Sequence, residues 1–227
     1  MSVSPLASQR SGLPGAEARP GLSAAGCPRC ATTLEEAPEA CPHCGFSLPS
    51  CARNFAFDPP PLEFLMDPEG RLAAGSGPVL TARRNALRTI VPQVDFSFCL
   101  VSLAAGHDVR DFSFWLFNSA PDLDASRAWQ ILVTADFTAG RIVLTPGYAV
   151  EPFLQHDPWN HALALLAERG GNDDWAGGIA AFLDRARGLL SIAAARAAAA
   201  DPPGSPRPGP DPESSGPAAP EPKPAAS

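Results

Sequence analysis

Two CxxC pairs near the start of the chain constrain its fold more than any other feature. They read CPRC and CPHC, with ten residues between them, and their cysteines are Cys27, Cys30, Cys41 and Cys44. Each pair can form a tight knuckle whose backbone amides point at the thiolates, and four thiolates complete a tetrahedral shell around a metal ion. Because such a shell leaves no position for water or substrate, the spacing predicts a structural zinc ion. A redox-active dithiol or disulfides are the alternative.

The knuckle sequences resemble those of zinc ribbons, although Ala31 stands where a glycine often follows the first pair. A module of fewer than about 40 residues needs a staple of this kind to fold. The net charge of the chain is −7, and around the knuckles Arg29 is the one basic residue against Glu35, Glu36 and Glu39. This balance argues against nucleic acid as a partner.

Composition divides the rest of the chain into segments. Proline occupies 10 of the last 27 positions, which contain no Leu, Ile, Val, Phe or Trp and so cannot bury enough apolar surface to offset chain entropy. The first 25 residues are mostly Ser, Ala, Gly and Pro and are interpreted in the same way. We therefore predict a disordered segment 1–25, a zinc ribbon 26–51, a linker 52–62, an α/β domain 63–200 and a disordered proline-rich tail 201–227.

We expect a cytoplasmic protein without an integral membrane segment. The first 25 residues contain no apolar run of signal-peptide length, and no stretch reaches the roughly 18 apolar residues of a membrane helix. An intracellular compartment also favours a metal site over disulfides for the CxxC array. Of the two remaining cysteines, Cys99 lies inside an apolar run and is expected to be a buried hydrophobic residue.

Hydrophobic periodicity predicts an α/β fold in which a small mixed β-sheet is packed between helices. Continuous apolar runs predict strands at 95–104, 129–136 and 141–146, the last two forming a hairpin. Helical spacing predicts helices at 81–91, 109–120, 158–171 and 173–200.

Four stretches within about residues 60–195 resemble the TPM-domain family of thylakoid-lumen and related bacterial proteins. They are LMDPEGRL (65–72), DVRDFSFWLFN (108–118), RIVLTPGYAVEPFL (141–154) and GGNDDWAGGIAAFL (170–183). The family's N-G-v-l step before its second strand is replaced here by RAWQILVT. The resemblance implies divalent-metal binding in a cleft, acid phosphatase activity, or a part in the assembly or repair of membrane complexes. It matches Asp67 and Glu151 to acidic positions of the family.

Three carboxylates are therefore candidate ligands of a divalent cation such as Ca²⁺ or Mg²⁺: Glu151, Asp67 and Asp136. Asp136 joins the other two because it ends a predicted strand, where cleft residues of open sheets tend to lie. Each has a structural alternative. Glu151 can face a helix N-terminus, Asp67 can open the DPEG turn, and Asp136 can belong to the hairpin turn.

Two functions follow as expectations. The first is a protein-interaction factor, active in the assembly or maintenance of a complex without strong catalysis, in which the zinc ribbon docks a protein partner. The second is a divalent-metal-dependent acid phosphatase that acts through cleft carboxylates, where the cation polarises a phosphoryl oxygen and orients a water molecule.

Overall fold

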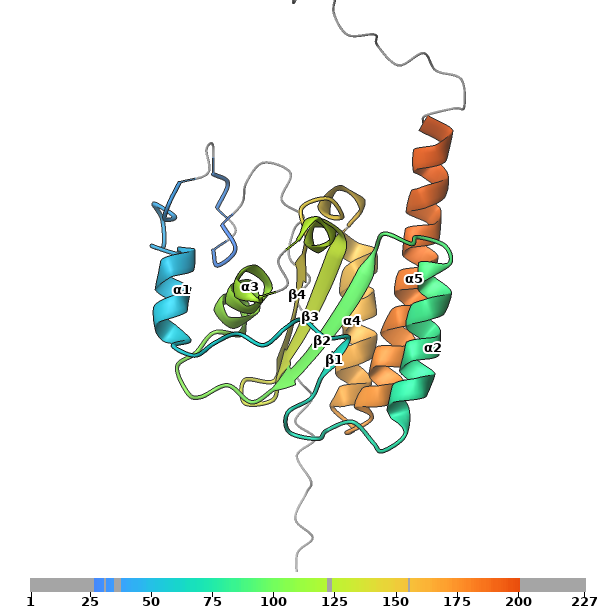
Figure 1. The fold of residues 1–227 in the computed structure, drawn as a ribbon, viewed down its shortest axis with the longest axis horizontal. Helices are drawn as coiled ribbons and strands as arrows, with labels where there is room; N and C mark the ends of the chain where they lie inside the picture. The colour runs from blue at the N-terminus through green and yellow to red at the C-terminus, as the bar shows by residue number, and fades with distance from the viewer. Residues whose placement is uncertain (1–26, 31, 35–37, 122–123, 155, 201–227) are drawn as a thin grey trace, which may run out of the picture.

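The computed structural model describes residues 27–200 except 31, 35–37, 122–123 and 155. The segments 1–25 and 201–227, both predicted to be disordered, lie outside the described residues. The described part is an α/β fold around one mixed four-stranded sheet with helices on both sides (Figure 1). The predicted fold class is therefore confirmed.

The sheet has the strand order β1-β2-β3-β4. Its strands are β1 (Leu65–Met66), β2 (Asp95–Val101), β3 (Gln130–Asp136) and β4 (Arg141–Pro146). β1, β2 and β3 are parallel, and β4 returns antiparallel to β3 as the predicted hairpin. Two edges of the sheet follow from this topology: the amino edge, where β2 and β3 begin and β4 ends, and the carboxyl edge, where β2 and β3 end and β4 begins.

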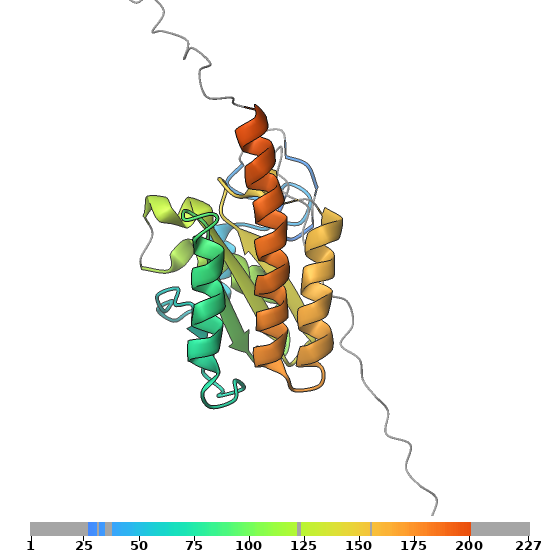
Figure 2. The ribbon, with the colours of Figure 1, turned by 90° about the vertical axis from the view of Figure 1, so that its right-hand side faces the viewer.

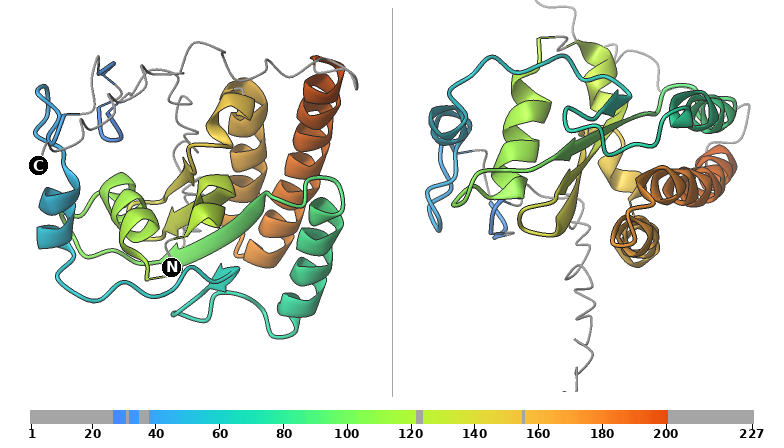
Figure 3. Two further views of the ribbon diagram at one scale, coloured as in Figure 1. Left: turned by 45° about the horizontal axis from the view of Figure 1, so that its top comes forward. Right: turned by 90° about the horizontal axis from the view of Figure 1, so that it is seen from below.

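Helices form a layer on each face of the sheet, as the two views of Figure 3 show. One layer contains α2 (Ser76–Arg88), α4 (His156–Gly170) and α5 (Trp175–Ala200), with α5 between the other two (Figure 2). The other face carries α3 (Val109–Ser119), with α1 (Leu48–Asn54) packed against it. Two short 3₁₀ helices, η1 (Ala125–Trp129) and η2 (Glu151–Phe153), lie near the amino edge.

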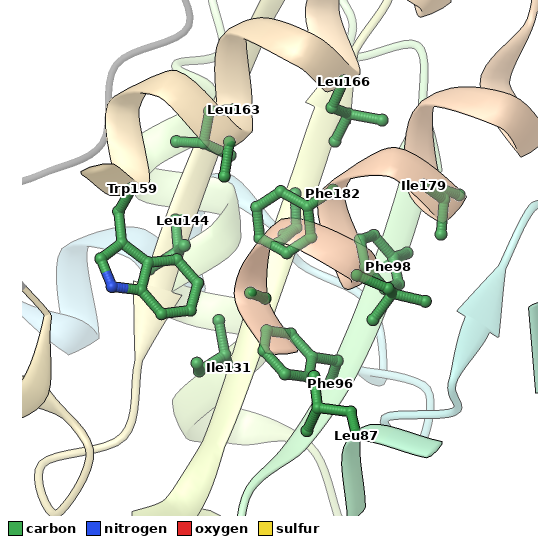
Figure 4. Close-up of a cluster of buried hydrophobic side chains, with 14 of the residues drawn as sticks. Leu87, Phe96, Phe98, Ile131, Leu144, Trp159, Leu163, Leu166, Ile179 and Phe182 are labelled. Atoms are coloured by element: carbon green, nitrogen blue, oxygen red, sulfur yellow. The ribbon is translucent and has the colours of Figure 1, made fainter. Parts of the chain in front are cut away.

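Both faces of the sheet are buried, which explains why the central strands read as continuous apolar runs. Phe96 and Phe98 of β2 point toward α4 and α5, whereas Cys99 points toward α3. Phe182 of α5 meets both phenyl rings edge-on, at centroid distances of 5.9 and 5.7 Å (Figure 4). Trp159 of α4 completes this aromatic centre.

Two helices differ from the predictions. α2 begins five residues before the predicted start at 81, because Gly75 adopts a left-handed φ of 83° at its N-cap and Pro78 lies in the first turn, where no donor is needed. α1 was not predicted and begins at a capping box between Ser47 and Ser50. α1 also runs across the predicted ribbon–linker boundary at residue 51.

Across the described residues, no helix has both the length and the apolar character needed to span a bilayer.

Candidate metal centre

The two knuckles have nearly the same backbone geometry. The Cys27 N–H donates to the carbonyl of Thr32 and the Cys41 N–H to that of Phe46, each over 2.8 Å. Gly45 closes the second knuckle with a left-handed φ of 70°, which explains the glycine of CPHCG. The Arg29 N–H lies 3.4 Å from the Cys27 Sγ, so a backbone donor points at a thiolate as predicted.

The four sulfur atoms have the spacing of a tetrahedral metal site. All lie within 4.8 Å of one another, with 3.6 Å between the Sγ atoms of Cys27 and Cys44 and 3.8 Å between those of Cys30 and Cys41. A tetrahedron with metal–sulfur bonds of about 2.3 Å has sulfur–sulfur edges of about 3.8 Å, whereas a disulfide bond is about 2.05 Å long. The arrangement therefore fits a four-thiolate metal ion, for which zinc or iron is the usual occupant.

The cysteines of the site differ in the pKa of their thiols. Hydrogen bonds with Thr32 lower the pKa of Cys30 to about 5. Burial raises the pKa of Cys44 to about 12 and also raises that of Cys27. A metal ion would offset this cost by stabilising the thiolates, so binding releases protons and should weaken at acid pH.

The metal module, residues 27–55, packs directly on the sheet domain. Cys27 and Cys41 belong to a buried apolar cluster with Phe55 of the module and with Phe112 and Trp115 of α3. The Phe55 ring lies 5.3 Å from the ring of Phe112 and 5.3 Å from that of Trp115, measured between centroids. The module therefore covers the face of α3 that points away from the sheet.

A polar clamp joins the first knuckle to α3. The Arg29 Nε donates to Asp111 Oδ1 over 3.0 Å, and the Arg29 Nη2 pairs with Oδ2 of the same carboxylate. The Asp111 carboxylate is buried, and hydrogen bonding to it raises the pKa of Arg29. Arg29 also lies over the Phe46 ring, with its guanidinium carbon 5.3 Å from the ring centroid. Sequence analysis did not single out Asp111, because its partner is 82 residues away.

Two of the three candidate carboxylates lie at the carboxyl edge, where they hold turns. Asp67 follows β1, and its two oxygens accept the N–H groups of Arg71 and Leu72 over 2.9 and 2.7 Å. Asp136 ends β3, and its Oδ1 accepts the N–H groups of Leu103 and Thr138 over 3.1 and 2.9 Å. The bonds of Asp67 and the bond from Thr138 to Asp136 are those of the turns given as structural alternatives, whereas the bond from Leu103 joins Asp136 to the segment that follows β2.

Glu151 lies at the other edge. It follows β4 and begins η2 at the amino edge, so the length of β3, six steps of about 3.3 Å or about 20 Å, separates it from Asp136. The fold thus does not bring Glu151, Asp67 and Asp136 together as one cation site. Within the described part, the four cysteines are the one group of three or more Cys, His, Asp or Glu residues close enough to hold an ion.

Glu151 has a distinct electrostatic environment. Burial raises the pKa of its carboxyl to about 7. The two other cysteines are also buried, and burial raises the pKa of Cys99 to about 12 and contributes most to the pKa of about 11 at Cys51. Both are thus thiols at neutral pH, which agrees with the expectation that Cys99 is a packing residue.

Comparisons with known proteins give only a distant likeness of structure. No family model matches the chain, and no curated protein matches it. The chain is similar to the solution NMR structure of the N-terminal domain of a protein from P. gingivalis, with 15% identity and a TM-score of 0.48 over 59% of this chain and 85% of that one. It is also similar to the NMR structure of the BA42 protein from Bizionia argentinensis, with 12% identity and a TM-score of 0.48 over 56% of this chain and 86% of that one. No family match confirms the TPM-domain resemblance, which stays a prediction.

Proposed function

We propose that this chain is a TPM-like protein with a structural zinc ion in its metal module, and that it acts in the cytoplasm by binding another protein during assembly or maintenance of a complex. The observation that supports this most directly is the closed set of four thiolates packed into the apolar cluster with α3. A metal ion there would have all its positions filled by the chain, so it would stabilise a surface and would not bind a reactant. The separation of the three carboxylates also favours binding over catalysis.

Two exposed apolar side chains, one in the metal module and one just after it, offer a contact surface for the partner. Leu48 opens α1 with 37% of its surface exposed, and Phe57 is 56% exposed although its ring touches Trp115 at a centroid distance of 4.8 Å. Exposed apolar side chains held on a rigid support are typical of interface anchors. We therefore place the docking surface for a protein partner at Leu48 and Phe57.

Cross-linking in the native cell tests this proposal with the full chain. The double variant Leu48→Ser/Phe57→Ser should lower the yield of the cross-linked partner about tenfold, as expected for loss of interface anchors. Val79→Ser is the matched control, because Val79 is 57% exposed on α2, outside the metal module. Equal yields from the wild type, the double variant and the control would contradict the proposal.

A phosphatase is the second candidate, and Glu151 is the observation that favours it. A carboxyl with a pKa of about 7 can exchange a proton near neutral pH, as a general acid or base does. The full chain would then hydrolyse p-nitrophenyl phosphate in the presence of Ca²⁺ or Mg²⁺, and Glu151→Gln would lower the rate about 100-fold or more. Glu168→Gln, which changes an exposed carboxylate of α4, is the control. Absence of metal-dependent hydrolysis, or hydrolysis that Glu151→Gln leaves unchanged, would exclude this function.

A further inference from the structure

Exposed aromatic side chains also lie on the segments at the amino edge, outside the metal module. Tyr148 is 78% exposed, the most exposed large apolar side chain of the described residues, and Phe153 is 37% exposed. Phe153 stacks on Trp129 of η1 with ring centroids 6.3 Å apart and an interplanar angle of 23°. We call Trp129, Tyr148 and Phe153 the aromatic rim.

Hydrogen bonds fix the backbone on both sides of Tyr148. The Gly147 N–H donates to the carbonyl of Gln130 at the start of β3 over 2.7 Å, and the Ala149 N–H donates to that of Ala128 in η1 over 2.9 Å. Both neighbours of Tyr148 are therefore fixed by backbone hydrogen bonds. A Cβ at Gly147 would lie 2.3 Å from the Arg127 carbonyl oxygen, which shows how closely the turn approaches η1. An aromatic side chain presented on a fixed backbone binds a partner with little loss of conformational entropy.

Aromatic side chains are the residues on which polyproline-type segments dock, because the extended conformation of these segments is already formed before binding. The chain carries such a sequence itself, in residues 201–227, with proline at 10 of 27 positions. Pro203 and Pro206, like Pro217 and Pro220, are three residues apart and would share one face of a polyproline helix, which has three residues per turn.

The end of α5 places this segment within reach of the aromatic rim. α5 extends past α2 and α4 at the same end of the molecule as η1 and η2 (Figures 1 and 2). The last buried residue of α5 is Leu190, so the ten residues that follow span about 15 Å of helix. A 27-residue polyproline segment spans about 80 Å, which is ample for a return to the rim.

Charge is also complementary at this end. Residues 185–200 contain three arginines and no carboxylate, whereas residues 201–227 contain four carboxylates against Arg207 and Lys223, a net charge of −2. Arg187 and Arg196 of α5 are exposed, as is Arg88 at the end of α2. These arginines attract a segment with a net negative charge toward the end of α5, whereas the carboxylates beside the rim itself, Asp124 and Glu151, do not add to this attraction.

We propose that the aromatic rim is a docking surface for a polyproline-type segment and that its occupant is the chain's own residues 201–227. The contact would occupy the rim, and a competing proline-rich sequence would displace residues 201–227 from it. It involves none of the residues of the metal module, so this inference and the proposed function can fail separately.

The single tyrosine of the chain makes the test specific. In the full chain labelled with 3-fluorotyrosine, Tyr148 gives the one ¹⁹F signal. Replacing all ten tail prolines by serine should shift and narrow this signal, because the ring loses its contact. Replacing Pro5, Pro14 and Pro20 by serine is the control and should leave the signal unchanged. An identical signal in the wild type and the tail variant would overturn the proposal.

The reciprocal experiment follows the tail. ¹⁵N relaxation of the Gly204, Ser205 and Gly209 amides should show restricted motion in the full chain, and Tyr148→Ala should lower the docked population about fivefold or more. Val79→Ala, which removes another exposed apolar side chain, should leave these amides as in the wild type. Equal motion of the tail amides in Tyr148→Ala and Val79→Ala would overturn the proposal. Amide motion that becomes more restricted as protein concentration rises would also overturn it, because the tail would then bind a second copy.

Discussion

At the scale of single residues, Gly147 has little freedom to change. A Cβ there would lie 2.3 Å from the Arg127 carbonyl oxygen and 2.5 Å from that of Ala128. Both are backbone atoms, so no side-chain rotation relieves the contact. We expect Gly147→Ala to lower the free energy of unfolding by about 1–3 kcal/mol in urea denaturation. Gly77→Ala is the control: nothing lies within 4 Å of its added Cβ, and alanine is favoured in helices. Equal destabilisation by both substitutions would contradict this explanation.

Glu151 should make stability depend on pH. Burial raises the pKa of its carboxyl from 4.5 to about 7, so the folded protein binds this proton more tightly than the unfolded chain does. The cost of ionising the carboxyl is absent below pH 4.5, grows between pH 4.5 and 7, and is constant at higher pH. Glu151→Gln removes that cost.

The melting temperature of Glu151→Gln relative to the wild type should therefore rise through this pH window and level off above pH 7. One pKa unit is worth about 1.4 kcal/mol, and partial exposure of the carboxyl reduces the expected gain to about 1–2 kcal/mol. Glu168→Gln, at an exposed position, should show no such trend. A difference between Glu151→Gln and the wild type that is the same at pH 4.5 and pH 8 would show that burial does not control this carboxyl.

At the scale of residues, the sequence predicts a site when the residues that form it are close together in the chain. The knuckle cysteines are close in sequence, and their spacing alone places them around one point. The three carboxylates were grouped by the family resemblance and by a strand end, although the predicted hairpin reverses the chain after Asp136. The antiparallel return of β4 carries Glu151 to the amino edge while Asp67 and Asp136 stay at the carboxyl edge. Asp111 meets Arg29 through tertiary packing, which no local pattern indicates.

At the scale of elements, the Arg29–Asp111 clamp joins the metal module to α3. The Asp111 carboxylate is only 7% exposed and the Arg29 side chain 32%, so removing the guanidinium leaves a buried charge without its main partner. We expect Arg29→Ala to lower the free energy of unfolding by about 1–3 kcal/mol, below the range for fully buried pairs because Arg29 is partly exposed. A double-mutant cycle with Asp111→Ala in urea should give a coupling energy of about 1 kcal/mol or more.

The exposed pair Arg83–Asp184, between α2 and α5, is the matched control for the clamp. Its side chains are 39% and 54% exposed, so the same cycle should give about 0.5 kcal/mol or less. Similar coupling energies for the two pairs would mean that the clamp does not depend on burial.

Whether an element was predicted depends on how clear a hydrophobic pattern its sequence carries. β2, β3 and β4 were predicted because they are buried on both faces and read as apolar runs. α1 was missed because seven residues give too short a period, and its capping box has Ser50 in place of the usual Glu or Gln. β1 has two residues and exists only because β2 lies beside it, so the sequence of Leu65–Met66 carries no strand pattern.

At the scale of the whole molecule, the two faces of the sheet are closed by different means. Long helices close one face, where α2, α4 and α5 form a large apolar cluster without any residue of the metal module. On the other face α3 is covered by the module, whose knuckles contribute Cys27 and Cys41 to the cluster. A metal ion would thus control the second cluster and leave the first intact.

Metal removal should therefore expose the cluster of the metal module and leave the other cluster buried, and tryptophan fluorescence can report this difference. Trp115 lies in the cluster of the metal module, whereas Trp129, Trp159 and Trp175 lie in or against the other. Elemental analysis should find about one zinc per chain, as a four-thiolate site binds one ion.

Chelation should red-shift the emission of the wild type, because Trp115 becomes exposed to water, and should leave most of the helical circular dichroism in place. Zinc should reverse the red shift, whereas magnesium should not. Trp115→Phe should lose most of the red shift. An absence of stoichiometric zinc or iron, or an equal shift in Trp115→Phe, would show that the four cysteines do not hold this face closed.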